Sequence, residues 1–288
     1  MSTGGGVSTG GAASIVWVGD ALVESHQAQV SVFDRAFTVG DGVFETLKVS
    51  QGHPFALTRH LTRLATSAQG LGLVAPDLDR VRQAVVETIA ANADAHELGR
   101  LRVEYTAGVG GSGSERGGGA PLLTITCTPT SPWPASTPVI TVPWPRNERS
   151  AIVGLKTTSY ADNVVALARA HAAGAGEAVM ANTVNMLCEG TGSNVFVVLG
   201  GEVVTPPLSS GCLPGITRAL VIQWCGASER DLPMSALTEA QEVFLTSSTR
   251  DVQPVSAVDG RAVPNAPGPL TRSVQRIFAE RSAQEMDP

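Results

Sequence analysis

The sequence predicts an α+β protein built of two domains, and three observations lead to that fold class. Segments with strand-like alternation and segments with helical apolar spacing follow one another in both halves of the 288-residue chain. A proline-rich stretch at 131–138 separates the halves, as expected of a linker between domains. The chain contains no internal repeat, which excludes a solenoid or a propeller.

The first half, residues 14–130, is expected to be a small domain of strands and helices. Helical spacing of apolar residues starts at Leu57, and a second helix is predicted over 77–91. A glycine-rich loop covers 108–119. Residues 1–13 lack a basic segment followed by an apolar one, so they are predicted to be a disordered tail and not a signal peptide. Strands are predicted from alternating or β-rich segments at 14–18, 21–32, 42–49, 100–106 and 122–128.

The second half, residues 139–288, is expected to be a larger domain of mixed β-structure with helices. A hairpin is predicted where Gly200 and Gly201 join two β-rich segments. The predicted strands of this half are 139–142, 151–156, 177–182, 194–199, 202–205 and 243–246. The strands 177–182 and 194–199 are expected to pair with each other. The predicted helices are 162–173, 216–224 and 270–281.

Composition and charge exclude several classes of protein. The net charge of −6 argues against a nucleic-acid-binding protein, which needs a basic face. No apolar run is long enough to cross a bilayer, so a soluble protein without membrane contact is expected. The four cysteines form no C-x-x-C pair, which predicts reduced thiols in the cytoplasm. Neither the cysteines nor the five histidines have the spacing of metal ligands.

Short motifs that would indicate other enzymes fail on their context. Residues 108–113 match G-x-G-x-x-G, but more glycines and a strand follow where a dinucleotide-binding fold needs a helix. This argues against an NAD(P)-dependent oxidoreductase. The P-loop sequence G-K-[ST] does not occur. Residues 6–10 match G-x-S-x-G, but they lie in the predicted tail.

Lysine is rare in this chain, which has only Lys48 and Lys156 beside eighteen arginines. A lysine can lose its proton and attack a carbonyl group, which arginine cannot do. Lys156 closes the apolar segment 151–156, where burial would lower the pKa of its amine. The alternative interpretation is a structural lysine whose ammonium reaches solvent from the end of a strand.

Three further segments offer groups that a phosphate-bearing cofactor needs. The free N–H groups of Ile216 and Thr217, at the start of a predicted helix, would bind an anion. One of Arg59 and Arg63, four residues apart on a helix, would hold a phosphate. Glu189, before a turn of small residues, would pair with a pyridine nitrogen. Taken singly, these features also fit an ordinary helix start, a solvated helix face and a turn residue.

Together, six motifs resemble those of the class IV (fold-type IV) enzymes that depend on pyridoxal 5′-phosphate (PLP). These are the branched-chain aminotransferases, the D-amino-acid transaminases and the 4-amino-4-deoxychorismate lyases. The resemblance extends from about Val16 to Val258. Its motifs are F-T-V-G-D-G-V-F-E-T (37–46), H-L-T-R-L (60–64), G-L-K (154–156), E-G-T-G-S-N-V-F (189–196), G-C-L-P-G-I-T-R (211–218) and L-T-S-S-T-R-D-V-Q-P-V (245–255).

The resemblance implies a role for particular residues of these motifs. Lys156 would bind PLP covalently and serve as acid and base, and Glu189 would pair with the pyridine nitrogen. Arg63, and not Arg59, would bind the phosphate. Further cofactor contacts are implied for Ser193, Ile216, Thr217 and Ser248. The resemblance also implies a homodimer with the active site near the subunit interface, and a fold of a small N-terminal α/β domain and a larger mixed β domain with helices.

Departures from the family's patterns separate its activities. Branched-chain enzymes have a tyrosine five residues after the lysine, whereas here Tyr160 comes four residues after it. The loop 108–119 lacks the R-x-H sequence of D-amino-acid transaminases and is glycine-rich, as in the lyases. Thr46 is also shared with the lyases. Thr46, Tyr160 and Thr249 are the candidate substrate-binding residues.

The sequence therefore predicts a 4-amino-4-deoxychorismate lyase, which releases p-aminobenzoate and pyruvate in folate biosynthesis. The alternative is an aminotransferase that acts on D-amino acids or branched-chain L-amino acids with 2-oxoglutarate, and one enzyme with both activities is a third option. A catalytically silent binding protein on the same fold is a hypothesis of a different class, and it predicts a colourless protein.

Overall fold

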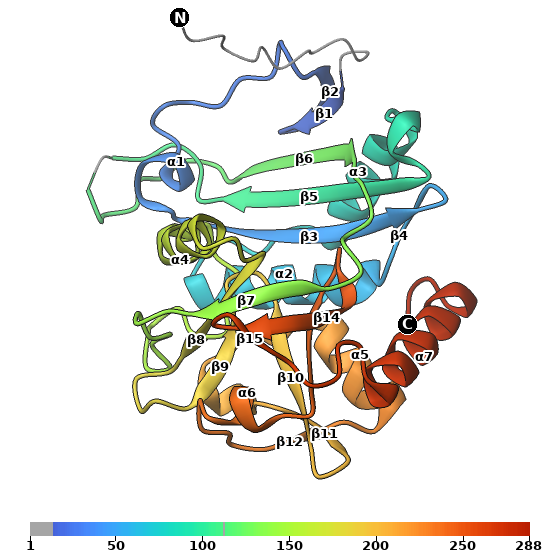
Figure 1. The fold of residues 1–288 in the computed structure, drawn as a ribbon. Coiled ribbons are helices and arrows are strands. Elements are labelled where there is room, and N and C mark those ends of the chain that lie inside the picture. Colours follow the sequence, from blue (N-terminus) through green and yellow to red (C-terminus); the bar gives the residue numbers. More distant parts are fainter. Residues whose placement is uncertain (1–13, 112) are drawn as a thin grey trace, which may run out of the picture.

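The computed structural model describes residues 14–111 and 113–288 of the chain, and it contains two β-sheets. All six strands of the first sheet end by Pro129, and all nine strands of the second begin at or after Thr137. In the view of Figure 1 the first sheet lies at the top and the second below it, with helix α2 (Leu57–Leu71) between them. The predicted tail and its G-x-S-x-G match lie outside the described residues.

The first sheet is antiparallel throughout, in the order β2-β1-β6-β5-β3-β4. Strands β3 and β5 pair along their whole length, from Gly42 opposite Thr106 to Ser50 opposite Leu98. The described residues between β5 and β6 contain no helix, so none is seen after the G-x-G-x-x-G match. The strands are β1 (Ile15–Val18), β2 (Ala21–Glu24), β3 (Gly42–Ser50), β4 (His53–Pro54), β5 (Leu98–Thr106) and β6 (Leu122–Pro129).

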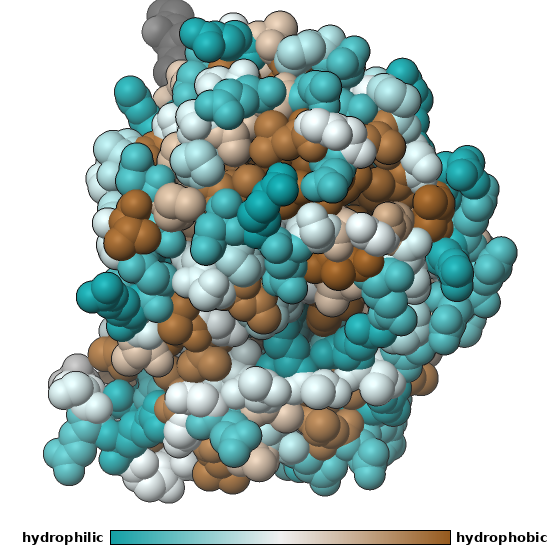
Figure 2. Space-filling model, turned by 90° about the horizontal axis from the view of Figure 1, so that it is seen from below, coloured by the Kyte–Doolittle hydropathy of each residue, from teal (hydrophilic) through white to brown (hydrophobic). Residues whose placement is uncertain are grey.

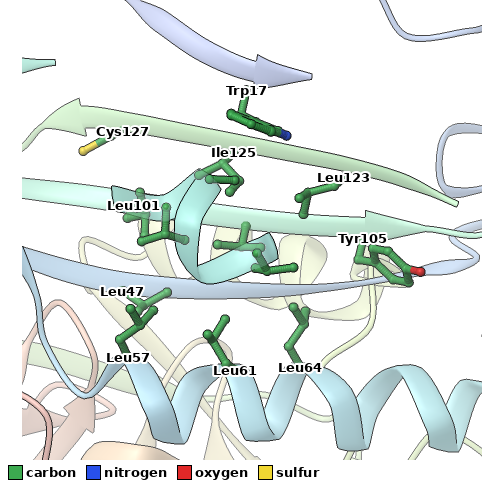
Figure 3. Close-up of a cluster of buried hydrophobic side chains, with 14 of the residues drawn as sticks. Trp17, Leu47, Leu57, Leu61, Leu64, Leu101, Tyr105, Leu123, Ile125 and Cys127 are labelled. Carbon is green, nitrogen blue, oxygen red and sulfur yellow. The ribbon is translucent and has the colours of Figure 1, made fainter. Parts of the chain in front are cut away.

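One face of the first sheet packs on α2 and α3 (Leu78–Ala90). Apolar residues of α2 recur at helical spacing, and Leu57, Leu61 and Leu64 point toward the sheet in Figure 3. Burying each leucine contributes about 1.5–3 kcal/mol. The side chain of Asp77 caps α3 by accepting from the first free N–H groups of the helix.

The second sheet is mixed, and six of its strands form a closed circle. The order is β12-β11-β10-β13-β14-β7-β8-β9, and β9 pairs with β10 as well as with β8. The parallel pairs are β7 with β8, β7 with β14, and β11 with β12. The strands are β7 (Thr137–Thr141), β8 (Glu177–Ala181), β9 (Leu187–Gly190), β10 (Asn194–Leu199), β11 (Glu202–Thr205), β12 (Ser228–Glu229), β13 (Glu242–Ser247), β14 (Asp251–Val258) and β15 (Arg261–Ala262), the last of which pairs with β14.

The remaining helices are α1 (Arg35–Val39), α4 (Ala161–Ala172), α5 (Ile216–Cys225), α6 (Ala236–Glu239) and α7 (Pro269–Gln284). Helix α7 packs on α5, where Phe278 and Leu220 are buried. Figure 2 shows the molecule from below, with hydrophobic patches in the middle of this face and a hydrophilic surface on the side of α7. Within residues 14–111 and 113–288, every helix is too short or too polar to cross a membrane.

The predicted strand 151–156 is wrong. Residues 151–154 form turns, in which the N–H groups of Val153 and Leu155 bond to the carbonyls of Ser150 and Ile152. Gly154 ends the turn in the left-handed conformation, with φ of +75°. The apolar side chains of Ile152, Val153 and Leu155 line a cavity, while the backbone of 151–154 forms turns and no strand. Apolar composition alone therefore did not distinguish a strand from this segment.

Two other predictions need correction. The predicted strand 21–32 ends at Glu24, because the chain turns back there and the N–H of Gln27 bonds to the Glu24 carbonyl. The predicted strands 177–182 and 194–199 do not pair as neighbours, because β9 lies between them. The assignment of 14–130 and 139–288 to separate domains joined by 131–138 stays a prediction.

The segment that carries Lys156 joins the two sheets. The N–H of Phe44 on β3 bonds to the Lys156 carbonyl at 3.0 Å, and the N–H of Thr158 bonds to the Gly42 carbonyl at 2.8 Å. These two bonds continue the pattern of a strand along the outer part of β3. Lys156 is therefore held against the first sheet while the chain on either side belongs to the second half of the sequence.

Candidate active site

One cavity of about 360 Å³ lies where the two sheets meet, and every residue predicted for the site lines it. The predicted residues come from both halves of the chain and from seven separate segments. They are Thr46, Arg63, Lys156, Tyr160, Glu189, Ser193, Ile216, Thr217, Ser248 and Thr249. Arg59 lies elsewhere, where it bonds to Gln223 and the carbonyl of Pro288.

Lys156 carries an amine that is suited to lose its proton. Its Nζ lies 4.3 Å from the centre of the Phe44 ring, and among the described residues no carboxylate forms an ion pair with it. Burial, reinforced by the charge of Arg63, lowers the pKa of the Lys156 amine from 10.5 to about 8. Lys48, the only other lysine, differs because its Nζ bonds to the carboxylate of Asp251 at 2.7 Å.

An anion-binding corner lies at the start of α5. No side chain caps this helix, so the N–H groups of its first turn have no acceptor within the helix. Arg63 lies beside them, because one of its Nη1–H groups donates to the carbonyl of Pro214 at 3.0 Å. The hydroxyl of Thr246 lines the same cavity and is buried with no hydrogen-bond partner among the described residues. Ser248 completes the corner, since it lines the cavity two residues further on.

Arg63 is fixed by a buried carboxylate, Glu45. Its Nε and Nη2 donate to the two oxygens of Glu45 at 2.8 and 2.6 Å, which leaves one N–H on each terminal nitrogen for a ligand. Glu45 also accepts from Nδ1 of His60 at 2.6 Å. Burial opposes the charge of Glu45, but Arg63 and His60 outweigh it and hold the pKa of Glu45 at about 2. The carboxylate is therefore ionised.

Glu189 brings a buried carboxylate to the lining of the cavity. It lies on β9, and its Oε2 accepts from the N–H of Leu213 at 2.9 Å. Its Oε1 lies 3.1 Å from Nε of Arg146. Burial raises the pKa of Glu189, and the charge of Arg146 opposes that rise. A cation that binds next to this carboxylate would be stabilised.

The hydroxyl groups of Tyr160 and Ser193 are already bonded within the protein. Tyr160 donates to the carbonyl of Thr191 at 3.0 Å, and its ring packs edge-on against Phe44. Ser193 donates at 3.0 Å to Glu177, a buried carboxylate that also accepts from the N–H of Thr191 at 3.1 Å. Both side chains line the cavity, and the cofactor contact of Ser193 and the substrate contact of Tyr160 stay predictions.

The wall next to Lys156 on the first sheet is polar and cationic. Thr46 on β3 and Arg102 on β5 are directly opposite each other across the two strands, and both line the cavity. The guanidinium of Arg102 lies 3.8 Å from the centre of the Phe44 ring and is held by Glu104. A negatively charged part of a substrate would find a cation here, within reach of the amine of Lys156.

These groups fit PLP. The cofactor has a phosphate, an aldehyde and a pyridine nitrogen, and the cavity offers an anion-binding corner, a partly deprotonated amine and a carboxylate. The uncapped helix start and the unpartnered Thr246 hydroxyl are what a bound phosphate would satisfy. The residues that would hold the cofactor are Arg63, Lys156 and Glu189 with the start of α5 and Ser248.

Four residues of the site and its surroundings were not predicted from the sequence: Glu45, His60, Arg102 and Arg146. A signal for Glu45 was present, because it occupies the face of β3 on which Val43, Leu47 and Val49 are buried. A carboxylate on the apolar face of a strand needs a buried partner. His60 likewise follows the buried phase of α2. Arg102 and Arg146 lie on a polar strand face and in an irregular segment, where the sequence has no such signal.

Comparison with known proteins identifies related sequences along most of the chain. The family described as class IV amino-transferases matches residues 42–258. A candidate branched-chain-amino-acid aminotransferase from Methanocaldococcus jannaschii is 31% identical over 278 residues, which cover 92% of this chain and 95% of that protein. The D-alanine aminotransferase of Bacillus licheniformis is 30% identical over 264 residues, which cover 88% and 92% of the two chains.

Solved structures of aminotransferases are also similar to this chain. The branched-chain aminotransferase of Thermoproteus uzoniensis with norvaline has a TM-score of 0.88 and 29% identity, and covers 93% of this chain and 94% of that one. A hypothetical aminotransferase from Mycobacterium tuberculosis in its PLP-bound form has a TM-score of 0.81 and 29% identity, covering 93% and 99%. A candidate 4-amino-4-deoxychorismate lyase from Legionella pneumophila has a TM-score of 0.82 and 26% identity, covering 89% and 96%.

Proposed function

The chain belongs to the class IV aminotransferase family, whose members depend on PLP, and from this premise we propose that it is a 4-amino-4-deoxychorismate lyase. The reaction splits its substrate into p-aminobenzoate and pyruvate. The atoms of these two products add up to those of the substrate, so no second substrate, oxidant or reductant is needed. The formation of an aromatic ring favours the products.

The residues of the cavity divide the work between binding and proton transfer. When bound, PLP supplies an electron sink for the charge that develops at the carbon carrying the substrate amine. Arg63, the first turn of α5 and Ser248 hold the phosphate, and Glu189 holds the pyridine nitrogen. Lys156 would hold the cofactor through its Nζ and, as a neutral amine, would take the proton from the carbon that carries the substrate amine. It gives that proton to the leaving enolpyruvyl group, which departs as pyruvate.

The polar and cationic wall formed by Thr46 and Arg102 is the observation that favours this substrate. The proposed substrate has two carboxylate groups besides its amine, so one of them can pair with the guanidinium of Arg102. A branched-chain amino acid would place an apolar side chain against this half-buried charge, whose carboxylate partner would remain Glu104. D-Alanine has no second carboxylate. A substrate with two carboxylates therefore suits this wall better than either amino acid does, and the 2-oxoglutarate of the alternative reaction shares that property.

The second candidate is an aminotransferase for D-amino acids or branched-chain L-amino acids with 2-oxoglutarate. The names of the relatives favour it, since two of them are a branched-chain and a D-alanine aminotransferase. Both reactions use the same amine and the same cofactor contacts, and they differ in the group that leaves and in the place to which the proton returns.

A direct assay separates the two candidates. The purified holoenzyme is incubated with 4-amino-4-deoxychorismate, and in parallel with D-alanine or L-leucine plus 2-oxoglutarate. The proposal predicts p-aminobenzoate as the main product, and a KM for the lyase substrate that rises roughly tenfold or more in Arg102→Gln. In Glu104→Gln the guanidinium remains and this KM should change little. Transamination without any p-aminobenzoate would overturn the lyase assignment.

The proposal includes a homodimer in the cytoplasm. Large apolar side chains are exposed on α1 and on the segment before it, among them Val32 at 66%, Phe33 at 60% and Phe37 at 75%. Contiguous apolar surface of this kind is typical of subunit contacts. The four cysteines are free, in keeping with a reducing compartment. Light scattering after gel filtration should give twice the mass of one chain, and Phe37→Asp should shift it toward one chain.

A further inference from the structure

His60 is a buried histidine with a partner at each ring nitrogen. It is 1% exposed, its Nδ1 lies 2.6 Å from a carboxylate oxygen of Glu45, and its Nε2 lies 3.3 Å from the hydroxyl oxygen of Ser248. The three side chains come from α2, from β3 and from the turn after β13. They connect Arg63 to Ser248, the two side chains proposed to hold the cofactor phosphate.

The donor and the acceptor of each hydrogen bond from Glu45 through His60 to Ser248 follow from the chemistry of the three side chains. Glu45 is ionised and can only accept, so Nδ1 of His60 must carry a hydrogen. In a neutral imidazole the other nitrogen, Nε2, is then an acceptor. The single hydroxyl hydrogen of Ser248 therefore points at Nε2. In this state Ser248 offers the cavity only oxygen lone pairs.

A phosphate needs the opposite arrangement. Its oxygens accept hydrogen bonds, so they would meet the lone pairs of Ser248 without a hydrogen between them. One added proton on Nε2 of His60 reverses the direction of the hydrogen bond between His60 and Ser248. Nε2–H then donates to Ser248, and the Ser248 hydroxyl donates to the phosphate. No bond is made or broken apart from the one to the added proton, which solvent supplies.

The charges around His60 keep it neutral until an anion arrives. Glu45 on β3 favours a protonated ring, whereas Arg63 on α2 and Lys156 in the 154–156 segment disfavour it. Burial is the largest effect and lowers the pKa of His60. A doubly negative phosphate bound by Arg63 and Ser248 would bring negative charge close to His60. That charge would favour the protonated ring.

We propose that His60 takes up a proton when the cofactor phosphate binds, and so turns Ser248 into a hydrogen-bond donor. His60 is thus a positioning residue that acts through Ser248. The inference rests on the proposed function only in using Arg63 and Ser248 as the phosphate site, and it holds whether the enzyme is a lyase or an aminotransferase.

Calorimetry of cofactor binding to the apoprotein tests this directly. The probe is pyridoxamine 5′-phosphate, which has no aldehyde and cannot bond to Lys156. Titrations at one pH in buffers of different ionisation enthalpy give the number of protons taken up. The wild type should take up about one proton more than His60→Gln, which cannot be protonated, and this difference should vanish with pyridoxamine, which has no phosphate. The affinity of His60→Gln for the phosphate-bearing probe should fall roughly tenfold.

Nitrogen NMR of the wild type keeps the test independent of whether His60→Gln folds. The chain has five histidines, so that ¹⁵N-histidine labelling gives few signals. The His60 signals should change from a neutral ring with hydrogen on Nδ1 to a charged ring when the probe is added. A ring that stays neutral, with the proton on the phosphate or with no proton taken up, overturns the inference. A protein that does not bind the probe at all contradicts the proposed function instead.

Discussion

Replacing Lys156 with methionine should stabilise the apoprotein at neutral pH, although it removes the residue on which the proposed reaction depends. Folding lowers the pKa of the Lys156 amine from 10.5 to about 8, mainly through burial. At about 1.4 kcal/mol for each tenfold change in the proton equilibrium, this costs about 3 kcal/mol of folding free energy. Methionine has a similar shape without the charge. It loses the contact with the Phe44 ring, worth about 0.5–1 kcal/mol, so the net gain should be about 2 kcal/mol.

The gain should depend on pH in one direction. The amine of Lys156 has a lower pKa in the folded than in the unfolded chain, so the unfolded chain binds more protons between pH 8 and 10.5. The wild type is therefore destabilised below pH 8 and recovers as the pH rises to 10.5. The difference between the variant and the wild type should be full at pH 7 and close to zero at pH 10.5.

Urea unfolding of both proteins, followed by tryptophan fluorescence, measures this difference. Lys48→Met is the matched control, because the amine of Lys48 is paired with Asp251 and its loss should destabilise the protein. A Lys156→Met variant that is less stable than the wild type at pH 7, or a difference that stays constant up to pH 10.5, would refute the reasoning.

Three other changes have defined outcomes. Arg63→Lys keeps the charge but loses the two-pronged contact, so fluorescence titration should show PLP affinity reduced roughly tenfold or more; unchanged affinity would remove Arg63 from the phosphate site. Glu45→Gln should lower the free energy of unfolding by about 3–5 kcal/mol. In the folded wild type the pKa of Glu45 is lowered from 4.5 to about 2. The loss of stability in Glu45→Gln should therefore be full above pH 4.5 and should fade toward pH 2. A loss of stability that does not fade would contradict the ion pairing. Glu177→Gln breaks a buried ion pair with Arg250 and should lower the free energy of unfolding in urea by a similar amount. Glu280→Gln breaks an exposed pair on α7 and should change it by less than about 0.5 kcal/mol. Equal effects of the two changes would show that burial does not determine the contribution of these ion pairs to stability.

Regular elements with strong periodicity were predictable from the sequence. The alternation of β3 and the helical spacing of α2 and α3 place their bounds within a few residues of the structure. The segment 151–156 was not predictable in this way, because its apolar residues face a cavity and its backbone groups are satisfied by local turns. Strand β9 is short and closes the circle of strands through pairings that only the complete sheet provides.

The site was predictable where a motif names a residue and less so where only the fold brings groups together. Lys156, Glu189 and Arg63 lie in motifs, and they line one cavity. The ion pair of Glu189 with Arg146 joins residues that are far apart in the sequence, and no local pattern reveals it. The direction of a hydroxyl is equally hidden: Tyr160 donates to the carbonyl of Thr191, a bond that no local sequence pattern reveals.

Borohydride reduction of the holoenzyme followed by peptide mass spectrometry tests the central claim most directly, because the chain contains only two lysines. Reduction makes the bond between the cofactor and its lysine permanent, so that the modified peptide identifies the residue. We predict that the phosphopyridoxyl group is found on the peptide containing Lys156 and that the absorbance of the cofactor near the visible range is lost. The group on the peptide containing Lys48, or on neither peptide, would contradict the assignment of the cavity as the active site.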